Sequence, residues 1–205
     1  MTSTPIPASN ESNTPNDQSN NIADTSATVN SSSSNQESTD QQLVQNNKPA
    51  HYNKKKSVLF VCLGNICRSP TCEGICRLIS NGDVDAQSAS TSSWHRNECP
   101  DERSQEICQK HGIDISSHRA RAIRNDDWEY FDVIAALDQK VLDTLSGMRP
   151  QNSTAKLLLF NAPNGVSDPY YGGRSGFQKM FQQIYNAMGD FLLDNNLIDK
   201  LSDRY

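Results

Sequence analysis

The amino-acid sequence predicts a single α/β domain with a central four-stranded parallel sheet flanked by helices, preceded by a disordered N-terminal tail. Two observations carry this prediction. Three short apolar segments and one segment of small residues alternate with segments of helical periodicity between residues 54 and 205, and such alternation is typical of parallel strands joined by right-handed crossovers. The first 53 residues contain no apolar run long enough to pack in a core.

Residues 1–53, the predicted tail, are dominated by Ser, Asn, Thr and Gln. A segment of this composition cannot bury enough surface to offset the entropy lost when its backbone is ordered. The tail carries five acidic side chains and one basic side chain, whereas residues 54–205 carry 19 acidic and 18 basic ones. The nearly neutral domain therefore predicts no nucleic-acid partner and no attraction to an acidic membrane surface.

In the first half of the domain we expect two strands and two helices. Residues 58–61, "VLFV", form a continuous apolar run of the kind that is buried on both faces of a sheet. A helix follows over residues 71–82, with apolar residues at helical spacing and a glycine at its end. Residues 85–94 are interpreted as a weak strand of small residues. Residues 100–112 predict a helix, with Pro and acids in the first turn and Lys, His and Gly at the end.

In the second half, residues 131–138, "FDVIAALD", predict another deeply buried strand. A short helix over residues 139–147 leads to a strand at residues 155–160, and a long amphipathic helix begins at Phe177. In a Rossmann-like sheet of this kind, ligands bind beyond the carboxyl ends of the strands. Functional residues are therefore expected directly after each strand.

The first strand ends in "CLGNICRSP", which has the chemistry of an anion-binding loop. Cys62 ends the strand and the next helix starts near Arg68, so successive backbone N–H groups and the positive end of the helix dipole face the loop. Gly64 and Asn65 tolerate the left-handed conformation that such a turn uses. Arg68 supplies a planar fork that matches two phosphate oxygens. The predicted phosphate-binding residues are Leu63, Gly64, Asn65, Ile66, Cys67 and Arg68.

The same positive field is expected to keep Cys62 as a thiolate, which is a nucleophile for phosphoryl transfer. The hydroxyl of Ser69 is expected to donate a hydrogen bond to this sulfur. One alternative is that Cys62 is a plain buried thiol. Another is a metal site formed by four cysteines, namely Cys62, Cys67, Cys72 and Cys76. Arg68 would place a cation among those ligands, so we expect neither a metal nor another cofactor.

A proton donor for the leaving group is expected in "DPYYGG", where Asp168 is the candidate. The proline after this acid stiffens the segment, and two glycines let it turn back over the anion-binding loop. Tyr170 and Tyr171 are expected to line a slot for a flat ring, with Trp94 as the opposite wall. The alternative interpretation is that "DPYYGG" is simply a turn.

The segments "VCLGNICRSP" and "DPYYGG", together with "TSSW", "HGIDISSHRAR" and "FDVIAALD", resemble the low-molecular-weight protein tyrosine phosphatase family. The resemblance runs from about Ser57 to the final helix. It implies that Cys62 is the nucleophile, that Arg68 clamps the phosphate, and that Asp168 is a general acid that later activates water. It also implies a polar network that supports the loop, made of Asn65, Ser69, Ser88 and His118.

The resemblance implies a metal-independent phosphatase that hydrolyses phosphotyrosine in proteins, and small aryl phosphates, through a phosphocysteine intermediate. The second loop cysteine, Cys67, would then form a disulfide with Cys62 under peroxide. Arsenate reductases on this scaffold have two further cysteines, which residues 138–156 lack. A non-catalytic phosphate-binding module would be expected to lack Cys62 or Asp168. Related arginine phosphatases have a smaller polar residue in place of Ile66.

The N-terminus has no basic segment followed by an apolar one, and no stretch is long enough to span a bilayer. We therefore expect a cytoplasmic monomer whose six cysteines are reduced thiols. Its expected partners are phosphotyrosine proteins or small aryl phosphates, with no nucleic acid and no membrane.

Overall fold

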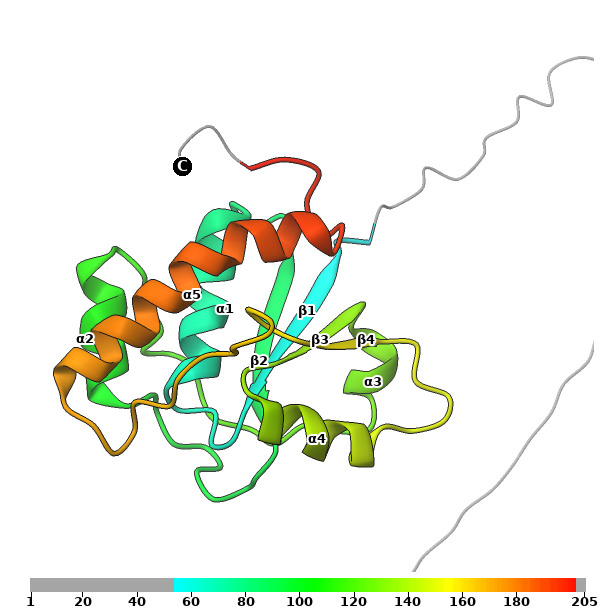
Figure 1. Ribbon diagram of the computed structural model, residues 1–205, viewed down its shortest axis with the longest axis horizontal. Helices are drawn as coiled ribbons and strands as arrows, with labels where there is room; N and C mark the ends of the chain where they lie inside the picture. The colour runs from blue at the N-terminus through cyan, green and yellow to red at the C-terminus, as the bar shows by residue number, and fades with distance from the viewer. Residues whose placement is uncertain (1–53, 202–205) are drawn as a thin grey trace, which may run out of the picture. The chain divides into compact units, whose positions relative to one another are not determined.

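The computed structural model describes residues 54–201, and the prediction of a disordered tail at residues 1–53 lies outside them. The described residues build one four-stranded sheet in the order β2-β1-β3-β4, and every neighbouring pair of strands is parallel (Figure 1). The strands are β1 (Ser57–Cys62), β2 (Asp85–Ser90), β3 (Val133–Ala136) and β4 (Lys156–Leu159). The predicted α/β architecture with a parallel sheet is confirmed.

Helices cover both faces of this sheet, as Figure 1 shows. The helices are α1 (Arg68–Ile79), α2 (Glu102–Lys110), α3 (Asp127–Tyr130), α4 (Gln139–Met148) and α5 (Arg174–Asp194). On one face α1 and α5 pack against the sheet, and α2 packs on these two helices. On the other face lie α3 and α4. Among residues 54–201, no helix combines the length and apolar character needed to cross a membrane.

The central position of β1 in the sheet explains why its sequence is apolar throughout. Successive side chains of a strand point to opposite faces. Val58 and Phe60 therefore join the core beneath α1 and α5, whereas Leu59 and Val61 join the core beneath α3 and α4. Because both faces are covered, all four side chains are fully buried, as the unbroken apolar run predicts.

Four elements differ by three residues or more from the sequence prediction. Helix α1 runs from Arg68 to Ile79 rather than over residues 71–82. Strand β2 ends at Ser90 rather than continuing to Trp94, because its partner β1 ends opposite it and turns into a loop. Helix α5 begins at Arg174, one turn before the apolar periodicity that starts at Phe177. Helix α3 was not predicted, since its four residues are too few to show a period; Trp128 anchors it in the core.

A close helix contact provides the first testable prediction. A Cβ atom on Gly74 of α1 would lie 2.7 Å from Cγ2 of Ile113 and 3.0 Å from Cγ2 of Ile115. Glycine to alanine normally stabilises a helix interior by about 1 kcal/mol. Here we expect Gly74→Ala to lower the free energy of unfolding by about 1–3 kcal/mol, because the added methyl group overpacks the contact.

Urea unfolding measures this effect, and Gly147 supplies the matched control. Gly147 lies near the end of α4, and a Cβ atom there would meet nothing within 4 Å. Gly147→Ala should therefore raise the free energy of unfolding by up to about 1 kcal/mol. If Gly74→Ala behaves like Gly147→Ala, the close packing of α1 on residues 113–115 is wrong.

Candidate active site

The loop between β1 and α1 is wrapped around the sulfur of Cys62. Cys62 is the last residue of β1 and only 3 % exposed. Asn65 has a φ of +57°, the left-handed conformation that its sequence position predicts. This turn directs the backbone N–H of Asn65 to Cys62 Sγ, with an N···S distance of 3.2 Å. Arg68 opens α1, so the positive end of that helix also faces the loop.

Ser69 lies 3.0 Å from the same sulfur, measured from Oγ to Sγ. The Ser69 oxygen accepts a hydrogen bond of 2.8 Å from the side-chain amide of Asn65. Its hydroxyl proton is therefore free to point at Cys62 or at the carbonyl of Ala89, which is more distant at 3.4 Å. The shorter contact favours donation to sulfur, which stabilises a thiolate.

The four residues of the predicted supporting network meet around the Asn65 side chain. Its amide nitrogen donates to Ser69 at 2.8 Å and to Ser88 at 2.9 Å. Its amide oxygen accepts from the backbone N–H of Arg121 at 2.9 Å and faces His118 Nε2 at 3.2 Å. Because the oxygen is an acceptor, His118 Nε2 carries the proton. All four hydrogen-bonding sites of the amide are used, and they hold Asn65 in its left-handed conformation.

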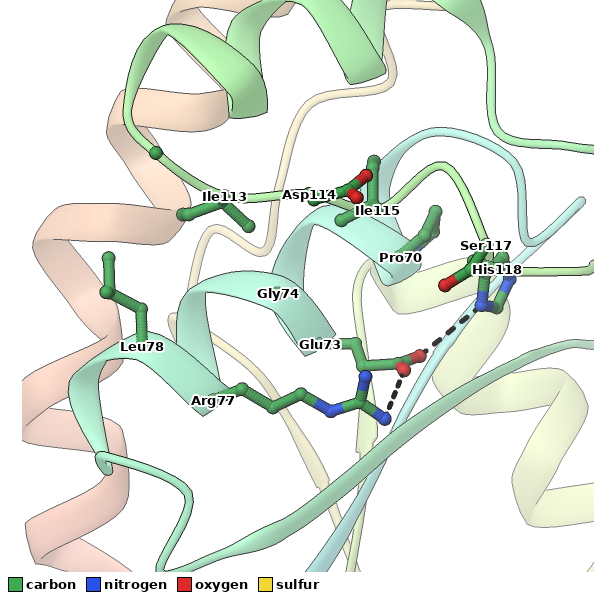
Figure 2. A pocket seen from close by; sticks show the side chains of 11 residues that line it. Pro70, Glu73, Gly74, Arg77, Leu78, Ile113, Asp114, Ile115, Ser117 and His118 are labelled. Atoms are coloured by element: carbon green, nitrogen blue, oxygen red, sulfur yellow. Dashed lines mark ion pairs between the residues drawn. The ribbon is translucent and has the colours of Figure 1, made fainter.

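The sequence reasoning missed Glu73, which closes this network from behind. Ser88 donates to Glu73 Oε2 at 2.7 Å, and the other carboxylate oxygen pairs with Arg77 at 2.6 Å. His118 Nδ1 lies 3.5 Å from Oε2, and Figure 2 shows Glu73 between His118 and Arg77. Burial lowers the pKa of His118, and the Glu73 carboxylate opposes this shift. The sequence did contain a signal for this role. Glu73 stands between two cysteines of α1 that face the core, and a carboxylate buried there needs polar partners.

The hollow drawn in Figure 2 is lined by Glu73, Arg77 and His118 and not by Cys62. Its volume is about 500 Å³. The cavity that contains Cys62 is smaller, at about 80 Å³. We assign the candidate active site to the smaller cavity, because the thiol, the loop amides and Arg68 converge there.

Arg68 lies between two carboxylates and is 3 % exposed. Its Nη1 is 2.6 Å from Asp138 Oδ2, and its Nη2 is 2.7 Å from Asp168 Oδ2. Burial opposes the charge of Arg68, but the neighbouring Cys62, Asp168 and Asp138 raise its pKa above the usual value. Asp138 also accepts from the backbone N–H of Val141 at the start of α4, so one side chain caps a helix and orients the guanidinium.

Asp168 lies at the mouth of the cavity, as its expected role requires. Its Oδ1 accepts from the backbone N–H of Tyr170 at 3.1 Å, while Oδ2 faces Arg68. Tyr170, Tyr171 and Trp94 all line the cavity, but Tyr171 is 99 % exposed and Trp94 75 % exposed. The predicted aromatic slot is thus a pair of open walls rather than a closed pocket.

His95 also lines this cavity and was not singled out from the sequence. Its ring centroid lies 6.0 Å from that of Tyr170, and its Nδ1 lies 2.7 Å from Glu98 Oε2. Its position directly after Trp94 was the available signal. A histidine beside an aromatic residue is nevertheless common on protein surfaces, so the sequence alone did not distinguish it.

The other cysteines differ in their surroundings: Cys67 lines the same cavity as Cys62, and Cys99 is exposed. Cys72, Cys76 and Cys108 are buried in the core, and burial raises the pKa of Cys76 to about 12 and that of Cys108 to about 11. Burial, followed by the charges of Asp101 and Cys62, also raises the pKa of Cys67. Within residues 54–201, no three His, Cys, Asp or Glu side chains are arranged to hold a metal ion.

Comparison with known proteins adds to this geometry. A family model described as low molecular weight phosphotyrosine protein phosphatase matches residues 57–202. A low molecular weight phosphotyrosine protein phosphatase of Schizosaccharomyces pombe is 40% identical over 151 residues, which cover 68% of this chain and 96% of the relative. A crystal structure of a protein tyrosine phosphatase from Entamoeba histolytica, with Hepes in its active site, is 28% identical with a TM-score of 0.63. That match covers 70% of this chain and 99% of the other.

A crystal structure of an arginine phosphatase from Drosophila is also similar. It is 31% identical with a TM-score of 0.63, and the match covers 67% of this chain and 96% of the other. Proteins with this scaffold therefore include phosphatases named for two different phosphorylated side chains.

Proposed function

Since this chain belongs to the low molecular weight phosphotyrosine protein phosphatase family and is a protein-tyrosine phosphatase, we propose that it works through a phosphocysteine intermediate on Cys62. One observation carries the proposal. The Cys62 sulfur lies against the Asn65 N–H at 3.2 Å and the Ser69 hydroxyl at 3.0 Å, at the end of a loop that Arg68 closes. These groups favour a thiolate and attract a dianion at the same place.

Substrate binding places the phosphate in the loop formed by residues 63–68. The backbone N–H groups of this loop and the fork of Arg68 bind the non-bridging oxygens. Arg68 keeps its bond to Asp138 through Nη1, while Nη2 leaves Asp168 for the phosphate. The Asp168 carboxyl group is thereby released to face the leaving oxygen.

The first chemical step forms a bond between Cys62 Sγ and phosphorus and breaks the bond between phosphorus and the phenolic oxygen. The proton of the Asp168 carboxyl group passes to that oxygen, so a neutral phenol departs. In the second step, the Asp168 carboxylate takes a proton from water, whose oxygen attacks phosphorus. The bond between sulfur and phosphorus breaks, and inorganic phosphate and the Cys62 thiolate are restored.

The walls of the cavity favour an aromatic phosphate ester. Tyr170 and Trp94 line the cavity beside the phosphate loop, and aromatic rings there suit a flat group on the bound phosphate. Ile66 narrows the cavity with an apolar side chain and offers no polar group to a guanidinium. We propose phosphotyrosine in proteins and small aryl phosphates as the substrates, rather than phosphoarginine.

Trapping the intermediate tests this mechanism. We expect rapid acid quench of the protein with a ³²P-labelled phosphotyrosine peptide, in EDTA, to yield a label that peptide mapping places on Cys62. The label should be absent from Cys62→Ser, because serine lacks the ionised sulfur. Labelled phosphoarginine in a parallel reaction should give little label. A reaction that proceeds without labelled protein, or stops in EDTA, contradicts the proposal.

A further inference from the structure

Arg103 of α2 contacts the residue before α2, a ring of α5 and the segment that carries Asp168. Neither its charge nor its position in α2 marks it as part of the site. Its Nε and Nη2 donate to the two carboxylate oxygens of Asp101 at 2.9 and 2.7 Å. Its guanidinium lies over the ring of Phe177 in α5, 4.2 Å from the ring centroid. The pair holds the pKa of Asp101 below its usual value. Two parallel bonds and an aromatic face fix the plane of the guanidinium.

The other N–H groups of Arg103 reach the segment that carries Asp168. Nη1 donates to the carbonyl of Gly172 at 2.7 Å, and Nη2 donates to the carbonyl of Tyr170 at 3.1 Å. The segment also bonds to itself, from Gly172 N–H to the Pro169 carbonyl at 2.8 Å. Arg103 therefore holds Tyr170 by its carbonyl, and the backbone N–H of the same residue donates to Asp168 Oδ1 at 3.1 Å.

Asp101 connects this arrangement to the phosphate loop. Its backbone N–H donates to the carbonyl of Ile66 at 2.8 Å, and its side chain binds Arg103. A chain of hydrogen bonds thus runs from the loop around Cys62, through Asp101 and Arg103, to the segment of Asp168. This chain sets the distance between the nucleophile and the acid.

The contact of Arg68 with Asp168 cannot do the same work during turnover. The nitrogen that binds Asp168 at 2.7 Å is the one that the phosphate takes in the proposed mechanism. The bonds from Arg103 go to backbone carbonyls rather than to the carboxylate, so phosphate binding leaves them intact. They also leave the Asp168 carboxyl group free to carry a proton.

We propose that Arg103 is a positioning residue that holds Asp168 in line with the leaving oxygen after the phosphate has occupied Arg68. The proposal rests on the proposed function of the site. The role of Arg103 is specific to proton donation, because Arg103 itself makes no hydrogen bond to residues 62–68.

The test compares two substrates in the full-length protein. Phenyl phosphate has a basic leaving group that needs a proton, whereas p-nitrophenyl phosphate has an acidic one that leaves without it. We expect Arg103→Gln to lower kcat for phenyl phosphate by about 10- to 100-fold, the scale of a misplaced catalytic group. The kcat for p-nitrophenyl phosphate should fall by less than about 3-fold, and KM for both should change little.

Arg174 provides a matched control. Arg103 is partly exposed and Arg174 is exposed. Like Arg103, Arg174 donates two hydrogen bonds to one carboxylate, that of Glu106, at 2.9 and 2.8 Å. Its pair also joins α5 to α2, but it makes no hydrogen bond to residues 168–172. Arg174→Gln should therefore leave the rates with both substrates unchanged.

Two further variants keep the result interpretable if Arg103→Gln folds poorly. Arg103→Lys retains the charge but has no planar fork, and should show a smaller loss with the same preference for phenyl phosphate. In an Asp168→Ala background, Arg103→Gln should cause no further loss with phenyl phosphate, because the group that it positions is gone. Equal losses with both substrates, or a full additional loss in that background, would overturn the proposal.

The single variant Asp168→Ala separates this proposal from the function on which it rests. If its loss is the same for both phenols, Asp168 is not the acid and both proposals fail. If its loss depends on the phenol but that of Arg103→Gln does not, the acid role stands and the role of Arg103 is refuted.

Discussion

Replacing Cys62 with serine should lower kcat for p-nitrophenyl phosphate by roughly 10⁴-fold or more, which is the scale expected when a covalent nucleophile is removed. The variant keeps the size and the hydrogen-bonding pattern of the side chain. An alcohol is not ionised near neutral pH, so the amide of Asn65 and the hydroxyl of Ser69 have no thiolate to stabilise. Steady-state rates at saturating substrate measure the loss.

The phosphate loop itself should survive this substitution. Because the loop amides and Arg68 are unchanged, we expect inorganic phosphate to bind Cys62→Ser with an affinity within about 3-fold of the wild type. Trp94 lines the cavity, so its fluorescence can report the binding. Cys99→Ser is the control, since Cys99 is an exposed cysteine outside the cavity, and its activity should equal that of the wild type. A Cys62→Ser protein with normal turnover excludes the phosphocysteine mechanism.

Replacing Asp168 with alanine should have the second largest effect, and its size should depend on the leaving group. Without a proton donor, the phenolate must depart as an anion. We expect kcat for phenyl phosphate to fall by about 10²- to 10⁴-fold and kcat for p-nitrophenyl phosphate to fall far less. A series of substituted phenyl phosphates measures this as a steeper dependence of rate on the acidity of the phenol.

The ion pair between Asp168 and Arg68 adds a second expectation for the same variant. In the free protein Asp168 lies 2.7 Å from the nitrogen that the phosphate needs. Removing this competitor should leave phosphate binding as tight as in the wild type, or tighter. Asp190→Ala, which removes an exposed carboxylate of α5, should change neither rate nor binding. Weaker phosphate binding by Asp168→Ala would mean that the carboxylate supports Arg68 rather than competing with the ligand.

Much of the fold could be predicted because its signals are local. The run from Val58 to Val61 is apolar on both sides of the strand, and the structure buries it between two layers of helices. The loop from Cys62 to Arg68 could be predicted equally well, since the conformation of Asn65 and the start of a helix follow from a few neighbouring residues. The local sequence did not predict where β2 ends, because a strand stops where its partner strand stops.

The missed residues share a different cause. Glu73 and Arg103 are charged side chains at helix positions, where the usual expectation is a solvated surface. Each finds its partner far along the chain, as Arg103 does with the carbonyl of Gly172, 69 residues away. No periodicity records such a pair, because it exists only once the sheet has brought the two segments together.

By itself, the sequence determined that a parallel α/β sheet forms and that a thiol, an anion-binding turn and an arginine follow its first strand. These features depend on side-chain period, backbone preference and short spacing, which are properties of neighbouring residues. Only the tertiary structure decided that Asp168 faces Arg68 across 100 residues of chain, that Glu73 braces the network behind the loop, and that Arg103 links the two halves of the site. Those contacts require distant charges to be desolvated and paired, and pairing is decided by the packing of the whole domain.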